Sequence, residues 1–108
     1  LYYSPPTIER MFDMKYRLNT PISVGEVNIS EKAQRLPRET IEDALERHRH
    51  CDWGNISLSD WMTNNRKVLD NGMPITSVYI VGKKALLVET WLTITTVKLI
   101  NRGANYAS

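Results

Sequence analysis

The chain has 108 residues, of which 42% are hydrophobic and 24% are charged, and its formal net charge is +2. This composition excludes a disordered or fibrous protein, and the length predicts one domain whose single core needs neither disulfides nor a metal. The near balance of charge excludes a general basic field that would by itself demand nucleic acid. The chain is small for an enzyme with an enclosed cavity, so an interaction module is the starting expectation.

Cys51 is the only cysteine. It cannot form a disulfide within the chain, which fits a reducing cytoplasm or a disulfide between two copies. No apolar run approaches the length of a membrane span, and residues 1–6 lack the basic start and apolar centre of a signal peptide. We therefore predict a cytoplasmic protein, monomeric or homodimeric, with no membrane partner.

The N-terminal residues 1–13 have no clean hydrophobic period and include the breaker Pro5-Pro6, which predicts an extension or arm. Its apolar residues could dock on the domain or on a partner; they are Tyr2, Tyr3, Ile8, Met11 and Phe12. Residues 14–108 are predicted to form a single α+β domain.

Residues 22–29 alternate apolar and polar side chains with a phase slip at Gly25, which predicts a strand with a bulge at the glycine. Ser30 is placed to cap a short helical turn that runs to Leu36. Pro37 suits the first position of a new helix.

Two helices are predicted next. The first has an apolar stripe at helical spacing, made of Ile41, Ala44, Leu45 and His48. Residues 52–55 have turn chemistry, and Ser57 or Ser59 then caps the second helix. The stripe of that helix consists of Trp61, Asn65, Val68 and Leu69. It is expected to end at Asn71-Gly72.

The remainder of the chain is rich in β-branched and aromatic residues, and this composition predicts three strands at residues 75–81, 85–90 and 93–100. Short links between the strands favour an antiparallel arrangement. The expected fold class is α+β: one N-terminal strand, two helices and a three-stranded antiparallel meander, with the helices packed on one sheet face.

The joint between the helices, residues 48–55, concentrates chemically active residue types. It holds His48, His50, Cys51 and Asp52, all of which can bind zinc. Their spacing and the lack of a second His or Cys cluster argue against a metal site, and we expect no metal and no cofactor. Neighbouring Cys and His side chains rarely meet, which also disfavours cysteine catalysis.

The structural interpretation of the joint is that His48 completes the apolar stripe and that Gly54 allows the chain to reverse. Asp52 and Trp53 are then expected to hold the two helices at a fixed angle, with Asp52 capping turn amides. An alternative is a hydrolase or nuclease built on His48, Asp52 and Glu89, although the common enzyme motifs are missing from the sequence and we expect no enzyme.

A second alternative is a small nucleic-acid-binding or plasmid-maintenance protein. Lys83 and Lys84 lie at a predicted hairpin tip, where they could contact phosphate while Trp91 and Tyr79 stack a base. The basic residues of this hypothesis are Lys83, Lys84, Lys98 and Arg102. The plainer interpretation is a solvated hairpin above core aromatic residues.

Several motifs in order resemble a family of small proteins carried on bacterial plasmids, conjugative elements and genomic islands. They are Val24-Gly25-Glu26-Val27, His48, Asp52-Trp53-Gly54, Asp60, Asn65, Ser77-Val78-Tyr79, Glu89 and Thr95-Thr96-Val97-Lys98-Leu99, and the resemblance spans about residues 14–100. Two positions depart from it: Trp91-Leu92 stands where the family commonly has Asp-Arg, and Cys51 stands where it usually has glycine.

Some small mobile-element proteins that are similar to this chain are anti-CRISPR proteins. The resemblance implies a non-enzymatic inhibitor that binds an RNA-guided, type II CRISPR effector nuclease in the bacterial cytoplasm and blocks guide-RNA loading or DNA engagement. Its partners would be the nuclease and its guide RNA. The acidic residues of the first helix could compete for the positively charged channel of such an effector, unless they are only a solvated face; they are Glu39, Glu42, Asp43 and Glu46.

Overall fold

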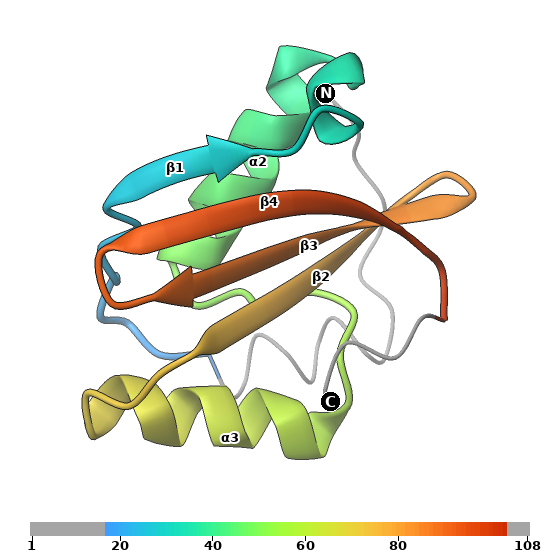
Figure 1. Ribbon diagram of the computed structural model, residues 1–108. Helices are drawn as coiled ribbons and strands as arrows, with labels where there is room; N and C mark the ends of the chain where they lie inside the picture. The colour runs from blue at the N-terminus through green and yellow to red at the C-terminus, as the bar shows by residue number, and fades with distance from the viewer. Residues whose placement is uncertain (1–16, 104–108) are drawn as a thin grey trace.

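The computed structural model describes residues 17–103, which form an α+β fold with two α-helices and one sheet (Figure 1). In chain order the elements are β1 (Glu26–Ile29), the 3-10 helix η1 (Ala33–Arg35), α2 (Arg38–Arg49), α3 (Leu58–Leu69), β2 (Ile75–Val81), β3 (Lys84–Trp91) and β4 (Ile94–Asn101). The α+β class is confirmed. The predicted arm at residues 1–13 lies outside the described residues.

The sheet has four strands in the order β1-β4-β3-β2. β3 runs antiparallel to both β2 and β4, whereas β1 runs parallel to β4, with Glu26 opposite Ile94 and Ile29 opposite Val97. The expected separate N-terminal strand beside a three-stranded meander therefore does not fit, since the strands make one mixed sheet. Short turns dictate antiparallel neighbours, but a parallel pair needs a long crossover, here the segment that contains both helices.

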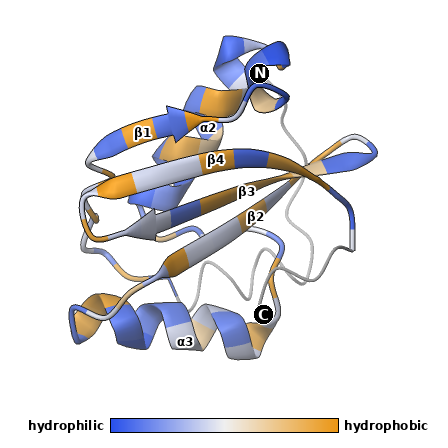
Figure 2. Ribbon diagram, in the orientation of Figure 1, coloured by the Kyte–Doolittle hydropathy of each residue, from blue (hydrophilic) through white to orange (hydrophobic). Residues whose placement is uncertain are grey.

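Successive side chains of each strand point to opposite faces of the sheet, and the face that collects most of the apolar ones is covered by α2 (Figures 1 and 2). The core on this face consists of Ala33, Ile41, Ala44, Tyr79, Leu86, Val88 and Val97. α3 instead lies along the β2 edge of the sheet, where a second cluster contains Cys51, Trp53, Trp61 and Ile75. The prediction that both helices pack on one face therefore holds for α2 but not for α3.

Two predicted boundaries shift for local reasons, and a third is confirmed. The strand expected at residues 22–29 begins only at Glu26, because Gly25 has a φ of +59° and its α-carbon lies against Thr93, where a Cβ would be 2.0 Å from the carbonyl oxygen. The Oγ of Ser57 accepts a hydrogen bond from Asp60 N at 3.1 Å, which confirms the N-terminal cap of α3. α3 ends at Leu69, before the left-handed Asn71.

The outer edge of β2 is closed by α3 and by residues 53–55. The side chain of Asn64 donates to Thr76 O at 2.7 Å. Val78 N donates to the carbonyl of Trp53, and Val78 O accepts from Asn55 N. The side-chain oxygen Oδ1 of Asn55 accepts a hydrogen bond from Ile80 N, the next backbone N–H along this edge, at 3.1 Å. The polar backbone groups on this edge are thus paired along most of the strand.

No helix in the described range is long and apolar enough to cross a membrane.

Candidate functional site

The joint between the two helices contains two residues with left-handed backbone. α2 ends at Arg49, and beyond it Cys51 has a φ of +63° and Gly54 a φ of +75°. Left-handed backbone favours glycine, so Cys51 adopts a conformation that a residue with a Cβ rarely takes. At Gly54 a Cβ would lie 2.2 Å from the carbonyl oxygen of Val78, so a side chain has no room there.

His48 is fully buried, and each of its ring nitrogens has a hydrogen-bond partner. Nδ1 lies 2.6 Å from Ser77 Oγ, and Nε2 lies 2.8 Å from Thr90 Oγ1. The hydroxyl oxygen of Thr90 lies 2.6 Å from that of Thr95, which donates to Val24 O at 2.6 Å. A continuous hydrogen-bonded chain therefore runs from β2 through α2 to β3, β4 and the segment before β1.

The last bond of this chain determines the direction of the others. Because Thr95 uses its single hydroxyl proton on Val24 O, it must accept from Thr90, and Thr90 must then accept from Nε2 of His48. Nδ1 of His48 is left as the acceptor for the hydroxyl proton of Ser77. His48 is thus a neutral imidazole protonated at Nε2, which agrees with its burial, since burial lowers the pKa of His48 to about 4.

The alternative catalytic set of His48, Asp52 and Glu89 is not brought together. Glu89 precedes Thr90 and therefore points to the opposite face of the sheet from His48; its carboxylate accepts from the hydroxyl of Thr76 at 3.1 Å. Ser77 and His48 have the spacing of a nucleophile and its base, but both side chains are 0% exposed, so a substrate cannot reach them.

Asp52 is held by an arginine and by the turn that follows. Arg47 donates to both carboxylate oxygens, at 2.8 and 3.2 Å, and Gly54 N donates to Oδ1 at 3.2 Å. The guanidinium of Arg47 also lies 4.6 Å from the centre of the Tyr79 ring, and the hydroxyl of Tyr79 donates to Asp52 O at 2.6 Å. Burial alone would lower the pKa of Arg47, but the hydrogen bond and charge of Asp52 outweigh it and raise that pKa.

Trp53 and Cys51 fill the space between the joint and α3. The indole Nε1 of Trp53 donates to Asn65 Oδ1 at 2.9 Å, and the ring meets His48 edge-on with centroids 5.6 Å apart. Trp53 therefore touches both helices. Cys51 Sγ donates to Thr20 O at 3.1 Å, and burial raises the pKa of the Cys51 thiol to about 11. Between residues 17 and 103 no three His, Cys, Asp or Glu side chains gather to hold a metal ion.

The acidic residues predicted to bind a partner all lie on α2, with exposed side chains: Glu39, Glu42, Asp43 and Glu46. Of these, Glu46 forms ion pairs with Arg49 at 3.1 Å and with His50 at 2.8 Å. The other three have no ion pair with any residue that the structure describes. Their exposed carboxylates lie on the side of α2 that faces away from the sheet, and the charge of Asp43 also acts on Arg47 one turn further along.

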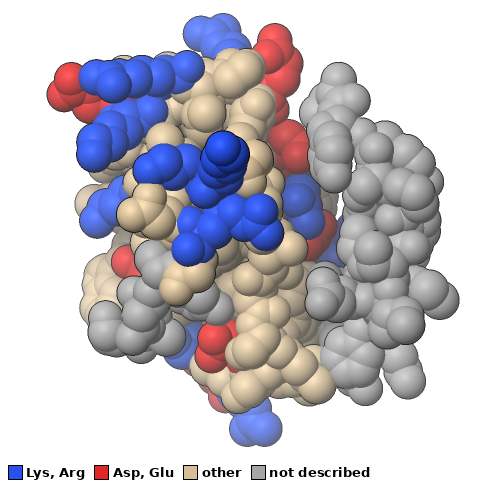
Figure 3. All heavy atoms as spheres, turned by 90° about the vertical axis from the view of Figure 1, so that its right-hand side faces the viewer, with Lys and Arg blue, Asp and Glu red and all other residues tan. Residues whose placement is uncertain are grey.

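The basic residues of the nucleic-acid hypothesis lie at one end of the sheet, and two further cations join them. We call this surface the basic end; it consists of Lys32, Arg35, Lys83, Lys84, Lys98 and Arg102. Figure 3 shows that Lys and Arg side chains gather across the face of the molecule that carries the β2–β3 turn. Lys32 and Arg35 reach the basic end because the parallel pairing of β1 with β4 carries η1 there.

The aromatic stack predicted beside Lys83 and Lys84 does not form. Tyr79 is only 3% exposed and its hydroxyl is bound to Asp52 O. Trp91 and Lys84 are the two terminal residues of β3, so about 23 Å of extended strand separates them at ~3.3 Å per residue. The prediction is wrong because a hairpin places its tip and the far end of its second strand at opposite ends of the sheet.

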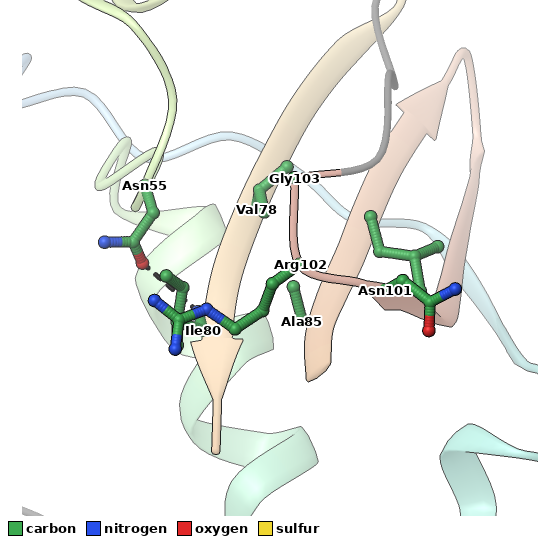
Figure 4. Close-up of a pocket in the computed structure, with 8 residues that line it drawn as sticks. Asn55, Val78, Ile80, Ala85, Asn101, Arg102 and Gly103 are labelled. Atoms are coloured by element: carbon green, nitrogen blue, oxygen red, sulfur yellow. Dashed lines mark hydrogen bonds between the residues drawn. The ribbon is translucent and has the colours of Figure 1, made fainter. Parts of the chain in front are cut away.

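A shallow hollow of about 200 Å³ adjoins the basic end (Figure 4). Its floor is apolar and comes from Val78, Ile80 and Ala85, and its polar rim comes from Asn55 and Arg102. Asn55 is bound to Ile80 N, and the guanidinium of Arg102 donates to Gly82 O at 3.3 Å. A hollow of this size is smaller than the usual small-molecule pocket of about 300–1,000 Å³, so charge is the more informative feature of this region.

The fold and the joint together define a small α+β protein with an acidic helix, a basic sheet end and a buried polar chain. Comparisons with protein-family models, with curated proteins and with solved structures find no match for it.

Proposed function

We propose that the protein is a non-enzymatic inhibitor encoded by a mobile genetic element, which binds an RNA-guided, type II CRISPR effector nuclease in the bacterial cytoplasm. It would block guide-RNA loading or DNA engagement. The motif resemblance from His48 to Leu99 suggested this function, and the exposed apolar tip of the β3–β4 turn supports a protein-binding role.

That tip is the observation that carries the proposal. Trp91 is 56% exposed, Leu92 65% and Ile94 44%, and Trp91 lies opposite Ile94 in the strand register. Clustered exposed apolar residues commonly mark protein-binding surfaces, and tryptophan is enriched among the residues that dominate binding energy.

The exposed acids of α2 support the same role by charge complementarity. RNA-guided nucleases hold guide and target in positively charged channels, and Glu39, Glu42 and Asp43 are exposed on α2 without an ion pair to any described residue. An inhibitor that presents such a helix competes with nucleic acid for the channel, while the apolar tip supplies contact area.

A cleavage assay tests the proposal. Purified protein is added to type II effectors from related bacterial hosts either before or after guide loading, and cleavage of a matched DNA target is measured. Inhibition only when the protein is added first indicates a block of guide loading, whereas inhibition at either order indicates a block of DNA engagement. Unchanged cleavage in both orders contradicts the proposal.

Matched variants locate the contact. The double variant Trp91→Ser/Leu92→Ser removes the apolar tip and is expected to reduce inhibition at least tenfold. Leu58→Ser/Met62→Ser removes two side chains that are each 45% exposed on α3 and serves as the control. If both pairs behave alike, the tip is not the binding surface.

A second candidate function, a small nucleic-acid-binding or plasmid-maintenance protein, is supported by the basic end. The six cations come from three separate segments of the chain, which only the folded sheet brings to one surface.

A further inference from the structure

The basic end has two groups of cations. Lys32, Arg35 and Lys98 line a shallow hollow of about 370 Å³ between η1 and β4, together with Glu31. The second group surrounds the β2–β3 turn: Lys84 Nζ donates to Asn101 Oδ1 at 2.6 Å, and Arg102 donates to Gly82 O, beside Lys83. Because β4 lies between β1 and β3 in the sheet, both groups face the same end of the molecule.

The charge of this surface is not compensated within the described part of the chain. All six side chains are exposed, and the ion pairs between residues 17 and 103 all lie at the C-terminal end of α2 and in the joint that follows it. The contacts that hold Lys84 and Arg102 are made to a side-chain amide and a backbone carbonyl, which are neutral acceptors. Glu31 is the one acid that lines the hollow, so the surface carries a large local excess of positive charge.

This excess is local, because the formal charge of the whole chain is only +2. The basic end holds six cations, whereas α2, with four acidic residues and three arginines, has a formal charge of −1. Such a separation orients a polyanion toward one surface, even though the average charge is small. Each lysine ammonium attracts a phosphate group as a point charge. The planar guanidinium groups of Arg35 and Arg102 can each donate two hydrogen bonds to two oxygens of one phosphate.

The spacing of the two groups selects the form of the polyanion. The register sets their separation: Lys84 pairs with Asn101 on β4, so Lys98 lies one strand spacing across the sheet and three residues along it from Lys84, or ~5 Å and ~10 Å. The major groove of B-DNA is ~12 Å wide, and the flexible lysine stems can cover the remaining difference. Each group can therefore neutralise the phosphates on one side of a single groove.

We propose that the basic end binds the phosphate backbone of double-stranded DNA, with one cation group on each strand across a groove. This inference rests on the second candidate function and deepens it by naming the ligand and its contacts. The described residues of this surface offer cations and no stacked aromatic pair, since Tyr79 is buried and Trp91 lies at the other end of β3. Binding is therefore expected to depend on charge and not on base sequence.

Fluorescence anisotropy of the full chain with a labelled duplex of about 25 base pairs tests this proposal. We expect equal affinity for duplexes of unrelated sequence and a marked loss of affinity between 50 and 200 mM salt, with a slope of about −0.9 per neutralised phosphate. The charge reversals Lys83→Glu/Lys84→Glu and Lys32→Glu/Arg35→Glu should each weaken binding at least tenfold, because each removes one of the two groups.

The matched control is Arg49→Glu/Arg66→Glu, which changes the net charge equally at exposed positions away from the basic end. It should weaken binding less than threefold, and melting curves of all three variants establish that they are folded. Parallel titrations use single-stranded DNA and duplex RNA of the same length, which should bind more weakly.

Three results overturn the proposal: no binding of duplex DNA at 50 mM salt, equal or tighter binding of single-stranded DNA or duplex RNA, or equal weakening by the control pair. These results are independent of nuclease inhibition. The Trp91→Ser/Leu92→Ser variant keeps the basic end intact and should bind duplex DNA normally, so a failure of one function is distinguishable from a failure of the other.

Discussion

The Nδ1 atom of His48 lies 2.6 Å from the hydroxyl oxygen of Ser77, with both side chains withdrawn from solvent. In an accessible site this pair would activate a nucleophile. Here the second ring nitrogen is bound to Thr90, and the hydrogen-bonded chain continues through the sheet. The pair therefore serves to orient buried side chains, and its measurable consequence is a dependence of stability on pH.

Lowering the pH should destabilise the protein through His48. Burial lowers its pKa from 6.5 to about 4 in the folded state, so between these values the unfolded chain binds the extra proton. Stability due to neutral His48 is complete above pH 6.5 and is lost as the pH falls toward 4, by at most about 3 kcal/mol. Urea unfolding at a series of pH values measures this loss.

Two glutamine variants isolate the contribution of His48 from that of the carboxylates. His48→Gln lowers stability at neutral pH but should lose less stability on acidification than the wild type. His50→Gln alters the exposed histidine and serves as the comparison. If the wild type and His48→Gln lose stability in parallel, His48 is not the titrating group.

The two buried tryptophans of the second core cluster should respond differently to the same substitution. Trp53 Nε1 donates to Asn65, whereas the buried Trp61 Nε1 has no hydrogen-bond partner among residues 17–103. Both changes to phenylalanine remove an indole N–H, but only Trp53→Phe breaks a hydrogen bond. We expect Trp53→Phe to cost about 1–2 kcal/mol more than Trp61→Phe in the free energy of unfolding. An equal cost would contradict the role given to the Trp53 hydrogen bond.

Gly54→Ala should be far more damaging than Gly82→Ala. Both glycines have a positive φ, +75° and +60°, so both variants pay a conformational cost of about 1–2 kcal/mol. At Gly82 nothing lies within 4 Å of the added carbon, while at Gly54 it would meet Val78 O at 2.2 Å. The expected difference is at least about 2 kcal/mol. Thermal melts of the pair measure it, and similar melting temperatures would contradict the tight approach of the joint to β2.

Cys51 should react with thiol reagents only when the protein opens. Its side chain is fully buried, and burial raises the pKa of the thiol to about 11, so little thiolate forms at pH 8. The reaction rate should rise by orders of magnitude in denaturing urea. A Cys51→Ala/Ser59→Cys variant carries its thiol at an exposed position of α3 and should react at once in native buffer. Rapid native labelling of Cys51, or a disulfide-linked dimer, would contradict this prediction.

Local patterns in the sequence predicted local features. The cap at Ser57, the stripe of α2 and the α+β class follow from spacing and propensity, which act between neighbours in the chain. The parallel pairing of β1 with β4 could not be predicted in this way, because no turn connects the two strands. Lys32 and Arg35 were not among the predicted binding residues for the same reason, because only the pairing of β1 with β4 brings them to the basic end.

The buried polar residues show a second limit of sequence reasoning. His48 was predicted correctly as part of the apolar stripe, but its partners come from β2 and β3, 29 and 42 residues away. Ser77 and Thr90 look like ordinary strand residues until the register places them on the inner face. A hydrogen-bonded chain of this kind depends on three-dimensional juxtaposition, for which a single sequence holds no local signal.

The closed outer edge of β2 also limits how copies of this protein can associate. An edge strand with free backbone groups is a template for another strand, and a sheet that is open at both edges can add copies without end. The backbone groups of Thr76, Val78 and Ile80 are already occupied by Asn64, Trp53 and Asn55. Strand addition at this edge is therefore blocked, and the sheet cannot grow through β2 into an open-ended assembly of copies.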